Sequence, residues 1–194
     1  MLSTAAERIL AAKEELTAID SRFGDADHGV TMEKIALAIK QETKSNAGDK
    51  ETLGGIASQI MCINGGSAVP LWSTFFDGMA NAIKGTDSLN ESAVKAMFAG
   101  ALAALQEITT AKVGDKTMMD SICPAVEAII NSTGDIRQML HAGALAAKQG
   151  AKDTEGYVAK FGRAKNYREQ TLGTPDAGAV SAMYFFIGMD EGLK

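Results

Sequence analysis

The chain has 194 residues and a mass of 20.3 kDa, a length that suits one domain better than two. Apolar residues make up 46% of the composition, enough to bury a sizeable core, so global disorder is excluded. The net charge is -5 and the pI is near 5.1. An acidic chain of this kind lacks the basic surface that binds nucleic acid or an anionic membrane, so we expect neither partner.

The two cysteines, Cys62 and Cys123, lie far apart among apolar neighbours. This pattern excludes a disulfide framework and a zinc site built on paired cysteines, and it suits a reducing compartment. The first twenty residues carry Glu7, Glu14 and Glu15, which a secretory signal peptide would not. No apolar run approaches the roughly 18 residues of a membrane span. We therefore predict a cytoplasmic protein.

Apolar residues recur with the period of an α-helix along most of the chain, and the alternation typical of strands is nowhere sustained. We expect one all-α domain over residues 1–194, with about eight helices. Thr4 and Glu7 predict a capping box for the first helix, and Pro124 predicts a kink or tilt in the sixth. The first expected helix follows this cap and carries Ile9, Leu16 and Ile19 on one face. The next cover residues 29–43, 52–63, 67–84, 90–109, 117–131 and 135–152, and the last starts at Pro175 or Asp176.

Two stretches have no helical period. Residues 44–50 are polar and predict a connecting loop. Residues 156–174 are the least periodic part of the chain, and a loop of this length inside a compact domain is typically functional.

An acidic segment stands between the first two predicted helices. It reads Asp-Ser-Arg-Phe-Gly-Asp-Ala-Asp-His-Gly and places Asp20, Asp25 and Asp27 within eight positions. If these carboxylates converge, they repel one another by about 4 kcal/mol per pair at 4 Å and an effective dielectric of 20. A protein holds such a group together by raising a pKa or by binding a cation. Ligands with oxygen only suit Mg²⁺ or Ca²⁺ rather than Zn²⁺.

Three other interpretations of the acidic segment depend on its residue spacing and its surroundings. A solvated acidic turn with Asp27 as the helix N-cap is the plain structural alternative. An EF-hand that begins at Asp25 would need ligand side chains at Gly29 and Ala36, so it fails. A phosphatase-type Asp-x-Asp would follow a hydrophobic strand, whereas here the preceding segment is helical and polar. Magnesium held by three aspartates, with phosphates completing the shell, is the functional hypothesis that remains.

The residues after the aspartates favour a phosphate ligand. His28, Gly29, Val30 and Thr31 begin a predicted helix, and the free N–H groups of a helix start attract anions. Gly29 would let a phosphate approach the backbone closely. His28 is a possible phosphate or ribose contact, although a lone histidine is as often structural.

Three further turns could contact the same ligand. The turn Asn-Gly-Gly-Ser-Ala at residues 64–68 precedes a helix, as ordinary glycine punctuation also does. The turn Gly-Asp-Lys-Thr-Met-Met-Asp at residues 114–120 lacks the P-loop spacing, and the structural alternative is a helix start capped by Asp115 or Thr117. Met118 is a core residue or an apolar wall for a base. Arg163 is a phosphate contact or one half of a surface ion pair. His141, Trp72, Phe75 and Phe76 are interpreted as structural.

The order of these turns resembles one family. Asp20-x4-Asp25-Ala-Asp27-His28-Gly29, the Gly65-Gly66 turn, Gly114-Asp-Lys-Thr-Met118, Gly162-Arg163-Ala and Gly173-x-x-Asp176-x-Gly178 occur in that sequence along nearly the whole chain. Together they resemble the nucleotide-binding L subunit of dihydroxyacetone kinase.

The resemblance implies a barrel of eight antiparallel amphipathic helices, with ADP or ATP at one end and two Mg²⁺ ions on Asp20, Asp25 and Asp27, which serve as catalytic and metal residues. It implies a partner K subunit that holds dihydroxyacetone covalently on a histidine. The phosphoryl donor is ATP in one branch and a phosphohistidine protein of the sugar phosphotransferase system in another. The resemblance also implies nucleotide contacts at His28, Gly29, Val30, Thr31, Gly66, Ser67, Ala68, Thr109, Met118, Arg163, Asp176, Ala177 and Gly178.

The chain departs from the family pattern in the glycine turn, near the nucleotide and in the closing loop, where Lys165, Asn166, Arg168 and Gln170 break the usual sequence. Val69 replaces a glycine, Gln170 an arginine, Ala177 a proline and Thr109 a glycine. The aspartate motif is intact, so binding of magnesium nucleotide is the firmer expectation than the identity of the ketose, which is dihydroxyacetone or a relative such as erythrulose. The alternatives are a non-catalytic regulator that binds ADP or ATP on the same fold, and a helical interaction module with an incidental acidic turn.

Overall fold

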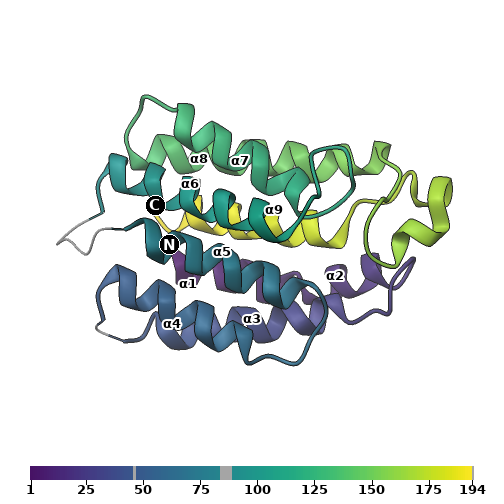
Figure 1. The fold of residues 1–194 in the computed structure, drawn as a ribbon, viewed down its shortest axis with the longest axis horizontal. Helices are drawn as coiled ribbons and strands as arrows, with labels where there is room; N and C mark the ends of the chain where they lie inside the picture. The colour runs from purple at the N-terminus through teal and green to yellow at the C-terminus, as the bar shows by residue number, and fades with distance from the viewer. Residues whose placement is uncertain (46, 84–88, 194) are drawn as a thin grey trace.

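The computed structural model describes residues 1–45, 47–83 and 89–193, and within these ranges every regular element is helical (Figure 1). The prediction of an all-α protein is therefore confirmed. The α-helices are α1 (Leu2–Ala11), α2 (Lys13–Asp20), α3 (His28–Glu42), α4 (Asp49–Met61), α5 (Ala68–Ala82), α6 (Glu91–Ile108), α7 (Met119–Asn131), α8 (Ile136–Asp153) and α9 (Ala177–Glu191). Two 3₁₀ segments, η1 (Thr154–Gly156) and η2 (Ala164–Thr171), precede α9.

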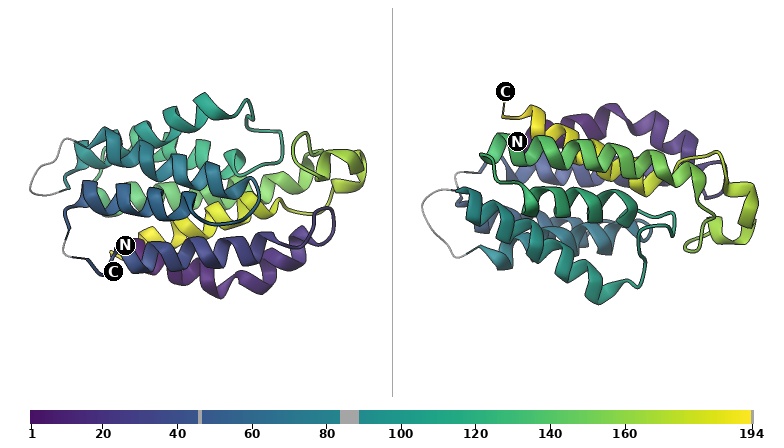
Figure 2. Two further views of the ribbon diagram at one scale, coloured as in Figure 1. Left: turned by 60° about the horizontal axis from the view of Figure 1, so that its bottom comes forward. Right: turned by 90° about the horizontal axis from the view of Figure 1, so that it is seen from above.

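The helices form a closed ring. Each helix from α3 to α9 packs against the next along the chain, and α1 packs against both α3 and α9. From α2 onward, successive helices run in opposite directions, as the two views in Figure 2 show, whereas α2 continues the direction of α1. Because α1 and α2 together occupy one position in the ring, the nine helices described make the eight-membered antiparallel barrel that was predicted.

Aromatic side chains fill the inside of this ring. Trp72 and Phe75 on α5 meet Phe185 on α9, with ring centroids 5.3 and 5.6 Å apart and the rings close to edge-on. Phe76 and Phe98 join the same cluster and are completely buried. Each buried ring stabilises the fold by about 1.5–3 kcal/mol, which confirms the interpretation of Trp72, Phe75 and Phe76 as core residues.

Several helix boundaries differ from the prediction. The first helix breaks at Ala12, whose ψ of 0° interrupts the α-helical geometry. The capping box of Thr4 and Glu7 is wrong, because α1 already begins at Leu2 and Thr4 lies inside its first turn. Helix α4 begins at Asp49, within the predicted loop 44–50. The predicted end of the fourth helix at Lys84 lies outside the described residues.

The connections fall at two ends of the barrel. The turns 21–27, 62–67 and 109–118 and the segment 154–176 all gather at one end, on the right in Figure 1. The chain termini lie together at the other end, where the backbone of Gly192 packs against that of Met1. Among the described residues, none of the helices combines the length and apolar character needed to cross a bilayer.

Candidate metal and nucleotide site

The three predicted aspartates converge at the end of the barrel where the turns gather. Asp20 is the last residue of α2, and Asp25 and Asp27 lie in the turn that leads into α3. One carboxylate oxygen from each lies within 4.8 Å of the other two. Ala26, between the second and third aspartates, has a φ of 60°, a left-handed conformation that turns the chain sharply there.

Asp20 organises this turn. One of its carboxylate oxygens, Oδ2, accepts hydrogen bonds from the backbone N–H groups of Asp27 at 3.0 Å and His28 at 3.3 Å. Gly24 lies flat against the same carboxylate, and a Cβ on it would stand only 2.0 Å from Asp20 Oδ1. Asp20 therefore acts as the cap of α3 from a distance. Asp27 occupies the N-cap position, but its side chain makes no capping bond, so it does not cap α3 as the structural alternative supposed.

The negative charges of the three aspartates are only partly balanced by nearby cationic side chains, and the pKa of Asp27 is raised. Partial burial raises the pKa of Asp27, and the neighbouring Asp25 and Asp20 carboxylates raise it further, while Arg163 opposes the shift. Arg163 makes an ion pair with Asp25, although its own side chain is 65% exposed. Three convergent carboxylates that repel one another are the donor set that hard divalent cations prefer, so these residues fit magnesium.

His28, the first residue of α3, is engaged inside the protein. Its Nε2 lies 3.1 Å from the Ser181 hydroxyl, whose own hydrogen is donated to the carbonyl of Gly178 at 2.9 Å. With the Ser181 hydrogen used in that bond, Nε2 is the donor to the Ser181 oxygen. Burial lowers the pKa of His28, which keeps the ring neutral. The ring thus fastens the start of α3 to the start of α9.

Gly29 has a packing role that the sequence did not indicate. A Cβ at this position would lie 2.1 Å from Thr17 Oγ1 and 2.3 Å from the carbonyl oxygen of Lys13, both on α2. The absence of a side chain lets α3 approach α2 closely, and this contact fixes where the helix starts. The N–H groups of Gly29 and Val30 belong to the first turn and so have no partner within the helix.

The second predicted turn lies beside the aspartates. A Cβ on Gly66 would stand 3.8 Å from Asp27 Oδ2, and one on Gly65 would touch the side chain of Thr31. Ser67 is the N-cap residue of α5, and Ala68 is its first residue. The structure thus brings the start of α3 and the start of α5 to the same carboxylates.

The third turn is built differently from the prediction. Met118 occupies the N-cap position of α7 without a side-chain bond, and Asp115 does not cap the helix. The Thr117 hydroxyl accepts from the N–H of Met119, the first residue of α7, at 3.2 Å, so the predicted threonine takes part in the cap. Instead Asp120, which is 1% exposed, accepts the N–H groups of Gly114 and Thr117, both at 2.6 Å. An aspartate in the first turn of a helix, three residues after a threonine, was the available signal for this role, and sequence reasoning missed it.

The start of α9 completes this wall. The side chain of Asp176 caps α9 by accepting from the N–H of Ala179 at 2.8 Å, and burial raises its pKa to about 7. A Cβ on Gly178 would lie 3.3 Å from the backbone nitrogen of Met118, so the predicted residues Met118, Ala177 and Gly178 are close neighbours. Thr109 ends α6 at the same end of the barrel, and its hydroxyl accepts from the N–H of Ala111.

The irregular segment reaches across to the acidic turn. It contains the 3₁₀ helix η2, so it is more ordered than the loop that was predicted. Arg22 donates to Thr174 Oγ1 at 3.0 Å, and Phe23 packs on Tyr167 with ring centroids 5.2 Å apart. With the ion pair of Arg163 and Asp25, these contacts join the segment 154–176 to the turn that carries the aspartates.

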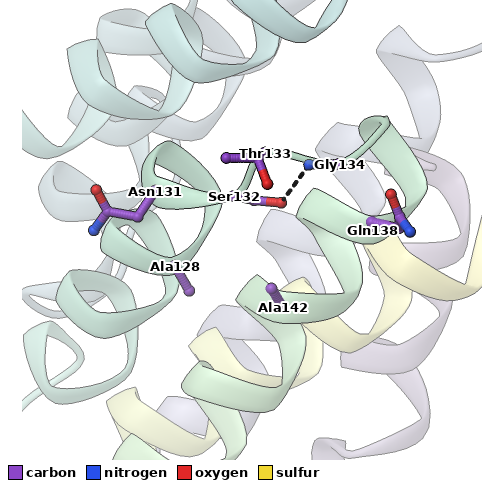
Figure 3. A pocket seen from close by; sticks show the side chains of 7 residues that line it. All are labelled: Ala128, Asn131, Ser132, Thr133, Gly134, Gln138 and Ala142. Carbon is purple, nitrogen blue, oxygen red and sulfur yellow. Dashed lines mark hydrogen bonds between the residues drawn. The ribbon is translucent and has the colours of Figure 1, made fainter.

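A separate hollow of about 490 Å³ lies between the end of α7 and the start of α8 (Figure 3). Its polar contacts belong to the turn itself, such as the N–H of Gly134 donating to Ser132 Oγ at 3.3 Å. The turn stands at the end of the barrel opposite to the aspartates. Its residues offer no carboxylate cluster, so the acidic end is the candidate site.

The fold and the site together define an all-helical barrel domain that brings three aspartates and several helix starts to one end. The chain belongs to the DAK2 domain family, whose model matches residues 22–191. It is 31% identical over 177 residues to "PEP-dependent dihydroxyacetone kinase, ADP-binding subunit DhaL" of Escherichia coli, covering 88% of this chain and 84% of that protein.

Longer relatives contain a similar region. The chain is 31% identical over 183 residues to the D-erythrulose kinase of Mycolicibacterium smegmatis, covering 91% of this chain and 32% of the kinase. It thus spans about a third of that protein's length. The crystal structure of the dihydroxyacetone kinase from C. freundii in complex with AMP-PNP and Mg²⁺ superimposes with a TM-score of 0.76 at 23% identity, covering 98% of this chain and 33% of the other. This likeness supports the barrel fold.

Proposed function

We propose that this protein is the nucleotide-binding subunit of a ketose kinase of the dihydroxyacetone kinase type. The observation that carries the proposal is the convergence of Asp20, Asp25 and Asp27 within 4.8 Å, next to the starts of α3 and α5. Bound magnesium, two ions in the proposal, would neutralise phosphate charge and orient the phosphoryl group that is transferred.

The remaining roles follow from the surroundings of the aspartates. The first-turn N–H groups of Gly29 and Val30 and the hydroxyl of Thr31 would hold phosphate oxygens, as would the turn of Gly66, Ser67 and Ala68. Asp20 would hold the start of α3 in place for this role, because its carboxylate accepts from the backbone N–H groups of Asp27 and His28. His28 would act mainly through its backbone, since its ring is bonded to Ser181.

The third turn and the start of α9 would hold the rest of the nucleotide. Met118, beside Gly178, is only 5% exposed and belongs to the core, so it would contact the adenine ring through the small part of its side chain that reaches the surface. Thr109 lies at the same end of the barrel, after α6. Asp176 and Ala177 border the same surface. Arg163 would exchange part of its contact with Asp25 for phosphate oxygens, because a guanidinium can bind either kind of oxygen pair.

The acceptor in this proposal is dihydroxyacetone or a related ketose such as erythrulose, held covalently on a partner K subunit in the cytoplasm. Phosphoryl transfer requires positioning and charge neutralisation more than covalent chemistry from this chain. The donor is ATP or a phosphohistidine protein of the phosphotransferase system. The relative named as an ADP-binding subunit of a PEP-dependent kinase supports the second donor.

Calorimetry with ADP, in magnesium and in EDTA, tests the nucleotide site. We expect binding only with magnesium, and its loss in Asp25→Ala and Asp27→Ala with helix content unchanged. Wild-type affinity in both variants would show that the carboxylates do not hold the metal.

A coupled assay tests transfer. The purified chain is combined with K-type subunits, dihydroxyacetone or erythrulose, and either ATP or a phosphohistidine carrier. Product formation supports the kinase. Tight binding of MgADP without turnover in any combination would instead identify a regulatory protein on the same fold.

A further inference from the structure

Lys116 is a buried lysine that takes part in none of the roles above. It lies in the turn between α6 and α7 and is only 4% exposed. Its φ of 62° is left-handed, a conformation that costs a non-glycine residue about 1 kcal/mol and that persists only where the surroundings enforce it.

The ammonium group of Lys116 joins the two ends of one segment. It donates to the carbonyl oxygen of Thr154, where α8 gives way to η1, and to that of Thr174 at 2.5 Å, just before α9. Both threonines are almost completely buried. Two further hydrogen bonds close the same base: the Gly173 N–H donates to the Glu155 carbonyl at 2.8 Å, and the Asp176 N–H donates to the side-chain hydroxyl of Thr154 at 2.9 Å.

The outer part of this segment is held more weakly. It meets the acidic turn through the ion pair of Arg163 with Asp25, the packing of Tyr167 on Phe23 and, near its base, the bond from Arg22 to Thr174. Lys160 makes a second exposed ion pair, with Asp115 in the turn between α6 and α7. The Arg163 side chain is 65% exposed, and exposed ion pairs contribute little to stability. The place of Arg163 therefore depends on the base of the segment, which projects from the end of the barrel in Figure 2.

We propose that Lys116 is a positioning residue of the nucleotide site: it closes the base of segment 154–174 and thereby holds Arg163 over the aspartate cluster. Burial lowers the pKa of Lys116, and the nearby carboxyl groups of Asp176, Asp120 and Glu155 oppose this shift. Methionine at this position would keep the apolar stem but leave two buried carbonyl groups without a donor. For its effect on nucleotide binding, this inference rests on the proposed function.

Limited trypsin digestion tests the closure without any nucleotide. The segment carries its own cleavage sites at Lys160, Arg163, Lys165 and Arg168, which mass spectrometry can identify. We expect Lys116→Met to be cut there about tenfold faster than wild type, because the base opens more often. The exposed Lys148→Met on α8 is the matched control and should be cut at the wild-type rate. An unchanged rate in Lys116→Met would overturn the proposal.

A double-mutant cycle with Arg163→Ala tests the positioning role. Lys116→Met should weaken MgADP binding about tenfold, and Arg163→Ala should then add little, because the arginine is already displaced. Equal losses from Arg163→Ala in both backgrounds would overturn the role, since simple destabilisation predicts additivity. If Lys116→Met does not fold by circular dichroism, Lys116→Gln takes its place. Its shorter amide side chain keeps two N–H donors, so we expect changes in the same direction but smaller, and wild-type cleavage and MgADP affinity would overturn the proposal. If the wild type binds no MgADP, the proposed function fails, while the digestion still decides the closure.

Discussion

Replacing Asp27 by asparagine should change stability in opposite directions without and with magnesium. The Asp27 carboxylate has an oxygen within 4.8 Å of oxygens from both Asp20 and Asp25. At that distance a pair of unit charges repels by about 1 kcal/mol in water and about 3 kcal/mol at an effective dielectric of 20. Since the cluster is partly exposed, and Arg163 attracts the same carboxylate, we expect Asp27→Asn to gain about 1 kcal/mol in EDTA.

With magnesium present, the wild type should be more stable than Asp27→Asn. A ligand present at 100 times its dissociation constant stabilises the folded state by about 2.7 kcal/mol. The wild type should gain this amount, whereas Asp27→Asn, with one charged ligand fewer, should gain almost nothing. Urea unfolding at pH 7 in EDTA and in magnesium measures both values. Asp49→Asn, at the start of α4 away from the cluster, is the control and should respond to magnesium as the wild type does.

The reasoning would be refuted if Asp27→Asn were less stable than the wild type in EDTA and gained as much from magnesium. That result would mean that the carboxylate is a structural hydrogen-bond acceptor rather than a metal ligand. It would leave the barrel unaffected but would remove the basis of the proposed function.

Two further substitutions test the packing and electrostatics around the site. Gly29→Ala should lower the free energy of unfolding by about 1–3 kcal/mol and weaken magnesium binding, because its methyl group would collide with α2. The control Gly54→Ala has open space around it and should raise the free energy of unfolding by about 0.5–1 kcal/mol in the same urea titration. Asp176 has a folded-state pKa of about 7, raised by burial and by Asp120 and lowered by Lys116. Its protonated form therefore adds stability that is full below pH 4 and is lost as the pH rises through about 7. Relative to Asp176→Asn, the wild type should lose about 1–3 kcal/mol over that range, and parallel stability curves would contradict the shift.

Much of the fold could be predicted because helix formation depends mainly on residues that are close together in the sequence. The spacing of apolar residues gave the class and most boundaries, and the density of carboxylates between residues 20 and 27 gave the cluster. The break between α1 and α2 at Ala12 was not predicted, because alanine is a strong helix former. The break depends on how the two helices follow the barrel, which the local sequence does not indicate.

Roles that depend on contacts distant in sequence could not be predicted. Gly29 looks like a phosphate-loop glycine, but its neighbours are Lys13 and Thr17 on another helix. Lys116 looks like a surface lysine within a polar turn, and only the fold brings it between Thr154 and Thr174. Buried polar residues in glycine-marked turns are the positions where sequence reasoning most needs a structure.

The contact between Met1 and Gly192 has a practical consequence for protein engineering. The two chain ends meet on the face opposite to the aspartates, so the polypeptide can be tethered there to another module without disturbing the chemistry at the far end. A short linker between the ends should also permit circular permutation, with new termini opened in the turn between α7 and α8.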